Sequence, residues 1–70
     1  MTTAAPHLTP REAECVAWVA AGKTDAEIAR LLKISARTSR FHVENARRKF
    51  GATNRPMLIS LMTKSEDTNS

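Results

Sequence analysis

Start and stop signals for helices recur along this chain, and they constrain its fold more tightly than any other feature. The segment TPRE at residues 9–12 is a capping box, in which the side chains of Thr9 and Glu12 each accept the other residue's backbone N–H. Pro10 stands at the first helical position, where an N–H would have no partner within the helix. We therefore predict a helix over residues 10–21, ended by Gly22 in a left-handed conformation.

Three further helices are indicated by signals of the same kind. A second capping box, TDAE at residues 24–27, opens a short helix over residues 25–32. Ser35 is a good N-cap and Gly51 a good stop for a helix over residues 36–50. Asn54 can cap a fourth helix over residues 55–63, with a proline in its first turn.

No segment has the alternating pattern of a β-strand, so the sequence predicts an all-α fold. Four helices joined by short turns make a four-helix bundle-like domain, whose second and third helices form a helix-turn-helix. We expect residues 1–7 to be a flexible N-terminal segment, residues 8–63 to be the domain and residues 64–70 to be a polar disordered tail.

The third helix has two contrasting faces. At about 100° per residue, Val43, Ala46 and Phe50 fall within about 40° of Ser39 and form the inward face. Ser39 places a hydroxyl in this apolar stripe, and we expect it to bond back to the Ser35 carbonyl. Valine there should then seat the helix more firmly and raise thermal stability. The opposite face gathers arginines around an aromatic ring: Arg37, Arg40, Phe41, Glu44 and Arg48, with Arg47 beside them.

Positive charge is concentrated on the same segment. The whole chain has a net charge of +4, whereas residues 33–55 contain seven basic residues and one acidic residue, a net charge of +6. Such a surface favours polyanions, nucleic acid above all. A solvated basic face is the plain alternative, but a helix-turn-helix in front of the helix favours DNA, because an α-helix fits the major groove and arginine can fork onto guanine there.

Three segments resemble the LuxR-type helix-turn-helix domain of bacterial transcription regulators. They are LTPRE (8–12), AAGKTDAEIARLLKIS (20–35) and RTSRFHVENARRKFG (37–51), and the family pattern reads roughly LTxRExEVLxLVAxGxSNKEIAxxLxISxxTVKxHxxNIxxKLGVxxR. The likeness extends from residue 8 to about 62 and is closest to the quorum-sensing branch. No segment resembles that branch's acyl-homoserine-lactone domain or a phosphorylatable receiver domain. We therefore expect either a self-standing module or a domain excised from a larger regulator.

The resemblance implies roles for individual residues. Arg40 matches the family's base-reading Lys or Arg, and Phe41 and Glu44 match neighbouring groove-facing positions. With Arg37, these are the predicted base contacts. Glu44 replaces a basic residue of other members, and Ser39 stands where valine is usual. The predicted phosphate contacts are Lys23, Thr24, Thr38, His42, Asn45, Arg47, Arg48 and Lys49.

The fourth helix resembles the family's dimerisation helix but is more apolar, with Met57 where a polar residue is common. A helix that is apolar nearly all round requires cover, so we predict a homodimer interface that consists of Met57, Leu58, Leu61 and Met62. Leu58, Leu61 and Met62 could instead close the core of a single chain. The leading hypothesis is a homodimeric regulator that binds a roughly palindromic site on double-stranded DNA. The alternative is a protein-interaction module that modulates a larger regulator or RNA polymerase through this helix.

Other functional classes have little support. No nucleophile and base, Gly-rich phosphate loop or metal-ligand spacing is recognisable, so we expect neither an enzyme nor a cofactor. Cys15, the single cysteine, cannot form an internal disulfide, which fits a cytoplasmic protein, and we interpret it as a core residue. No stretch approaches the roughly 20 apolar residues of a membrane span.

Two residues of the first helix allow more than one interpretation. Glu12 lies in the apolar stripe, and a buried carboxylate requires a partner, for which Arg55 and Arg30 are the candidates. Trp18 lies on the flank of the helix. It either seals the edge of the core or is exposed as a partner contact.

Overall fold

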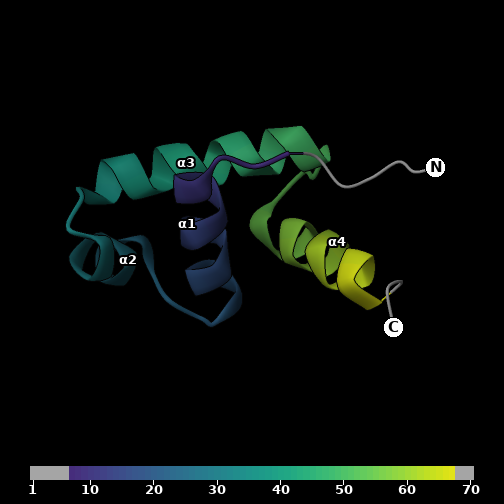
Figure 1. The fold of residues 1–70 in the computed structure, drawn as a ribbon, viewed down its shortest axis with the longest axis horizontal. Coiled ribbons are helices and arrows are strands. Elements are labelled where there is room, and N and C mark those ends of the chain that lie inside the picture. Colours follow the sequence, from purple (N-terminus) through teal and green to yellow (C-terminus); the bar gives the residue numbers. More distant parts are fainter. Residues whose placement is uncertain (1–6, 68–70) are drawn as a thin grey trace.

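The computed structural model describes residues 7–67, which form four helices (Figure 1). They are α1 (Pro10–Ala20), α2 (Asp25–Leu32), α3 (Ala36–Phe50) and α4 (Arg55–Asp67). No strand occurs among these residues, which confirms the all-α prediction. In Figure 1, α3 lies across the molecule, with α2 below its N-terminal end and α4 below its C-terminal end, and α1 packs against α3 between them.

Local capping explains why the helices begin where they do. The Thr9 N–H donates to Glu12 Oε1 at 3.0 Å while the Glu12 N–H donates to Thr9 Oγ1 at 3.1 Å, so the first capping box is confirmed. Thr24 and Glu27 form the second in the same way, at 2.8 and 3.2 Å. Asn54 Oδ1 accepts the Met57 N–H at 2.8 Å, as expected of the residue that caps α4.

Residues with a left-handed backbone conformation lie at the C-terminal ends of three helices. Gly22 and Gly51 have φ angles of 91° and 70°, as the sequence predicts. Lys33, which ends α2, has a φ of 59° although it carries a side chain. The turn between α2 and α3 therefore holds a lysine in a conformation that glycine adopts more readily.

The predicted end of the fourth helix is four residues too early. α4 continues to Asp67, so residues 64–67, predicted to be disordered, are helical. Polarity argued against burial of this segment, but Lys64, Ser65, Glu66 and Asp67 include no glycine or proline to stop a helix. Residues 1–6 of the predicted flexible segment 1–7, and the last three residues of the predicted tail, lie outside the described residues.

One small core joins all four helices. Its fully buried side chains come from α1 (Cys15, Val16), α2 (Ile28), α3 (Val43, Ala46) and α4 (Leu58). Trp18 packs half-buried against this cluster, so it seals the edge of the core. The core fixes α3 on one face and leaves its other face to solvent.

The buried carboxylate of α1 has a different partner from those expected. Glu12 is 4% exposed, and its Oε1 lies 2.6 Å from the ammonium of Lys49, so the prediction of Arg55 or Arg30 was wrong. Lys49 also donates to the His7 carbonyl at 3.3 Å. The hydrogen bond from Lys49, followed by that from the Thr9 N–H, lowers the pKa of Glu12. This ion pair ties the start of α1 to the end of α3.

A membrane span is not found among the described helices. None of the helices within residues 7–67 is both long enough and apolar enough to cross a bilayer.

Candidate nucleic-acid interface

The two faces of α3 differ sharply in exposure. Ser39, Val43 and Ala46 are fully buried against the rest of the domain. On the outward face, Phe41 is 58% exposed and the side chain of Arg40 is 73% exposed. Arg37 and Arg48 are exposed as well. The helical period thus sorts the residues of α3 as the sequence predicts.

An exposed aromatic ring among arginines is the most unusual part of this face. The rings of Phe41 and His42 meet edge to face, with their centroids 5.7 Å apart. His42 is half-buried, so it supports Phe41 from the side. An exposed apolar ring on the same face as Arg37 and Arg40 can contact a thymine methyl while the arginines contact guanine or phosphate.

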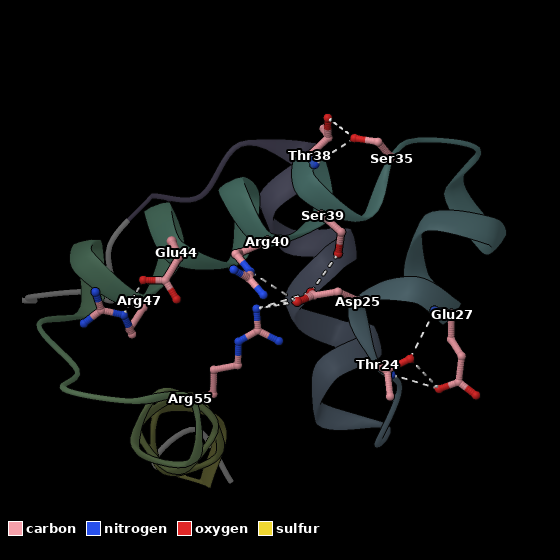
Figure 2. A network of polar contacts seen from close by, with 10 residues as sticks. All are labelled: Thr24, Asp25, Glu27, Ser35, Thr38, Ser39, Arg40, Glu44, Arg47 and Arg55. Atoms are coloured by element: carbon pink, nitrogen blue, oxygen red, sulfur yellow. Dashed lines mark hydrogen bonds and ion pairs between the residues drawn. The ribbon is translucent and has the colours of Figure 1, made fainter.

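Asp25, at the start of α2, joins three elements. Its carboxylate accepts hydrogen bonds from Arg55 of α4 at 3.0 and 3.2 Å, and it accepts the Ser39 hydroxyl of α3 at 3.1 Å (Figure 2). The expected bond from Ser39 to the Ser35 carbonyl was therefore wrong. Ser39 reaches across to α2 because its side chain points at a carboxylate that attracts a donor more strongly than a carbonyl does. Both oxygens of Asp25 are engaged, which locks the helix-turn-helix to α4.

Arg40 completes this cluster on the solvent side. Its Nε lies 3.9 Å from Asp25 Oδ2, and Figure 2 shows Arg40 and Arg55 approaching the same carboxylate. Asp25, Ala36, Arg37 and Arg40 line a hollow of about 280 Å³ between the starts of α2 and α3. The carboxylate therefore borders the outward face of α3.

The hydroxyls near the starts of α2 and α3 take part in capping. Thr24 caps α2, and the Ser35 hydroxyl accepts the Thr38 N–H at 3.0 Å while donating to Thr38 Oγ1 at 2.9 Å. Lys23 is exposed beside the start of α2, and Asn45 is half-buried on α3. Lys23, Thr24 and Thr38 thus lie at the starts of helices, and a helix N-terminus suits an anion.

Two of the predicted phosphate contacts are engaged inside the domain. Lys49 is held by the buried Glu12, and this pairing argues against the predicted phosphate contact, because the departure of Lys49 would leave a buried charge alone. Arg47 donates to Glu44 at 2.9 Å and to the Ala52 carbonyl at 2.7 Å, so it holds the turn after α3. Glu44 is likewise occupied by Arg47, and its side chain is 33% exposed. Arg37, Arg40 and Arg48 remain the exposed cations of this face.

The predicted interface on α4 also requires a correction. Leu58 is fully buried in the core of the single chain, so it was wrongly assigned to a surface. Leu61 and Met62 are half-buried against the same core, whereas Met57 is 42% exposed. Met57 accepts contacts from the N–H and hydroxyl of Thr53, at 3.4 and 3.3 Å from its sulfur.

Cys15 has the character of a core residue. It is fully buried, and burial raises the pKa of its thiol. It is therefore protonated at neutral pH, which does not favour thiolate chemistry. Among residues 7–63, whose side chains the structure describes, no three His, Cys, Asp or Glu side chains lie close enough together to hold a metal ion.

Asp25 is the residue that sequence reasoning missed. The sequence alone indicates no more than an acid inside a capping box, but the family pattern has asparagine at this position and valine at the position of Ser39. Two departures from the pattern, 14 residues apart, prove to be hydrogen-bonded to each other. The sequence signal for the Asp25–Ser39 pair is that both positions depart from the family pattern together.

The structure contains a short helix-turn-helix whose second helix has a basic outward face and packs against the helices on either side. This arrangement defines the DNA-binding type of transcription-regulator domain. The chain belongs to the luxR family of bacterial regulatory proteins, whose family model matches residues 6–62.

Individual relatives agree with this membership. The chain is 51% identical over 53 residues to the transcriptional activator protein VanR of Vibrio anguillarum, a match that covers 76% of this chain and 22% of VanR. It is 40% identical over 63 residues to the transcriptional activator protein BjaR1 of Bradyrhizobium diazoefficiens, with 90% and 26% covered. It is 47% identical over 53 residues to the transcriptional activator protein LuxR of Aliivibrio fischeri, with 76% and 21% covered. The chain thus spans about a fifth to a quarter of the length of these relatives.

Proposed function

We propose that this chain binds double-stranded DNA in a sequence-specific manner and regulates transcription, with α3 in the major groove. The observation that supports this most directly is the outward face of α3, where Arg37, Arg40 and Phe41 are exposed. On the inward face, by contrast, Ser39, Val43 and Ala46 are fully buried. Exposed arginines and an aromatic ring on a rigid helix suit the edges of bases. The family membership supports the same function, as do the names of the three relatives described above, each of which is called a transcriptional activator protein.

In this proposal the outward residues divide into two groups. Arg40, Phe41 and Arg37 contact bases, and Glu44 reaches a cytosine only if it exchanges Arg47 for the base. Phosphate contacts come from residues on either side of the groove: Lys23, Thr24, Thr38, His42, Asn45 and Arg48. The cytoplasm, where bacterial DNA lies, is the compartment that the proposal implies.

We further propose that two copies pair through α4. Met57 is the most exposed apolar side chain of this helix, with Leu61 and Met62 half-buried behind it. Two recognition helices in such a pair would read half-sites about 34 Å apart, one turn of DNA, which predicts a roughly palindromic operator. Sedimentation of the chain with and without a selected DNA duplex measures whether one or two copies bind.

Selection of bound sequences from a random DNA pool tests the proposed function. We expect a palindromic consensus and binding that weakens steeply as salt rises, because phosphate contacts release counterions. Arg40→Ala should weaken binding to the selected site about 5- to 100-fold and relax the preference at one base pair per half-site. Lys33→Ala, which removes one positive charge from the turn before α3, is the charge-matched control. Wild-type-like affinity of Arg40→Ala for every sequence would refute the groove assignment.

The alternative function is a protein-interaction module that modulates a larger regulator or RNA polymerase through α4. The exposure of Met57 is the observation that favours it. Binding to random duplex DNA at about 50 mM salt discriminates the two functions, because a phosphate-binding protein has measurable non-specific affinity there. No binding under that condition would favour the alternative.

A further inference from the structure

Asp25 is an acidic residue at the edge of a basic surface, and the proposed function gives it no role. A carboxylate near DNA repels phosphate, so its position calls for a compensating benefit. Its side chain is 19% exposed, and it lines the hollow that also has Arg37 and Arg40 at its rim. The carboxylate thus faces the arginine that is expected to reach the bases.

The contact between Asp25 and Arg40 leaves one edge of the guanidinium available. The ion pair joins Asp25 Oδ2 to Arg40 Nε at 3.9 Å. Guanidinium is a planar fork, so an arginine approached at Nε still has its two terminal amino groups free to donate side by side. A guanine presents O6 and N7 side by side in the major groove, which matches that edge.

Asp25 is itself anchored firmly enough to orient another side chain. Arg55 donates to both of its oxygens, and the buried Ser39 donates to Oδ1 (Figure 2). These partners come from α4 and from the inward face of α3, so the carboxylate is fixed to the domain and not to the flexible end of Arg40. An oriented arginine loses less conformational freedom when it binds than a free one does.

We propose that Asp25 is a positioning residue that holds Arg40 in the orientation for a guanine and so sets base discrimination at that position. The inference rests on the proposed function, because it requires α3 in the major groove. The same carboxylate draws Arg40 away from phosphates when the sequence is wrong, which lowers binding to non-specific DNA.

A purely structural role is the competing explanation, since Asp25 also links α2 to α4. Loss of that link would lower stability and would weaken binding to all DNA sequences alike. If Asp25 positions Arg40, its loss changes the ratio of the affinities for two duplexes that differ only at the base pair read by Arg40. This effect of Asp25 on the affinity ratio also disappears when Arg40 is absent. Discrimination is therefore the quantity to measure.

The experiment compares Asp25→Asn with Glu27→Gln in the full chain. Both remove one negative charge from α2, and glutamine is compatible with a capping box, so Glu27→Gln controls for net charge. Affinity is measured for the selected operator and for the same duplex with the guanine read by Arg40 replaced. We expect wild type and Glu27→Gln to discriminate about tenfold or more, and Asp25→Asn about threefold or less. In an Arg40→Ala background, Asp25→Asn should have no further effect on this ratio.

Two outcomes separate this inference from the proposed function. If wild type binds the operator and Asp25→Asn keeps full discrimination, the positioning role is refuted and DNA binding stands. If wild type binds no DNA at about 50 mM salt, the proposed function fails first.

A measurement on the free wild-type chain covers the case in which Asp25→Asn does not fold. Nitrogen relaxation of the arginine Nε–H groups should give Arg40 a higher order parameter than Arg37, which lines the same hollow. Equal mobility of the two side chains would refute the positioning role without any DNA or variant.

Discussion

Replacement of Ser39 by valine tests whether the inward face of α3 is held by a polar contact or by apolar packing. Family resemblance alone predicts that valine stabilises the domain. The structure predicts the opposite, because the fully buried hydroxyl donates to Asp25 Oδ1 at 3.1 Å. Asp25 keeps Arg55 in the variant, so the carboxylate is weakened in its contacts but not left alone.

The magnitude follows from three terms, two of which destabilise the variant and one of which stabilises it. Loss of a hydrogen bond to a charged acceptor destabilises by about 1.5–3 kcal/mol. Two buried methyl groups in place of one hydroxyl contribute about 1.6 kcal/mol in the opposite direction, at about 0.8 kcal/mol each. A larger side chain in a closed core adds strain of about 1 kcal/mol. The net loss of unfolding free energy is about 1–2 kcal/mol, which corresponds to a fall in Tm of about 5–15 °C for a domain of this size.

Thermal unfolding followed by circular dichroism measures this difference. Ser39→Thr is the matched control, because threonine has the shape of valine and retains the hydroxyl. We expect Ser39→Thr to unfold at a higher temperature than Ser39→Val, with the difference reporting the bond to Asp25. If Ser39→Val is as stable as both wild type and Ser39→Thr, the reasoning is refuted.

Three further predictions concern stability. Lys49→Ala leaves the buried Glu12 without its ammonium partner and should lower the free energy of unfolding, measured by urea titration, by about 2–3 kcal/mol. The double variant Glu12→Gln/Lys49→Ala should recover part of this loss. An unchanged urea midpoint in Lys49→Ala would contradict the pairing. Because Lys49 lowers the pKa of Glu12 below the ordinary value of a glutamate, the stabilisation is complete above that ordinary value and is lost as the pH falls through the folded-state pKa. Urea midpoints from pH 6 to pH 3 should therefore fall less in Glu12→Gln than in wild type. Lys33→Gly should stabilise the domain by about 1 kcal/mol, since φ at this position is 59°, and a lower Tm would show that the lysine side chain makes a contact of greater value.

The candidate site was predictable as far as its residues depend on one helix. The 3.6-residue period places Arg37, Arg40 and Phe41 on one side of α3 wherever the helix lies, and the structure exposes all three. The tertiary structure changes the expectation for Leu58 and Lys49 for one reason. Their positions on a helix follow from the sequence, but the neighbours that bury Leu58 and that pair with Lys49 do not, and α1 supplies the carboxylate that holds Lys49.

By itself, the sequence determined where the four helices begin and approximately where the first three end. Capping boxes and left-handed stops act through hydrogen bonds between residues three or four apart. The sequence alone therefore suffices to recognise the helix starts at TPRE and TDAE and the helix ends at Gly22 and Gly51. Only the tertiary structure decided which charged side chains pair. Glu12 meets Lys49 across 37 residues and Asp25 meets Arg55 across 30, and such meetings depend on how the helices cross. Contacts of that range give Asp25 its place beside Arg40, which no local pattern could indicate.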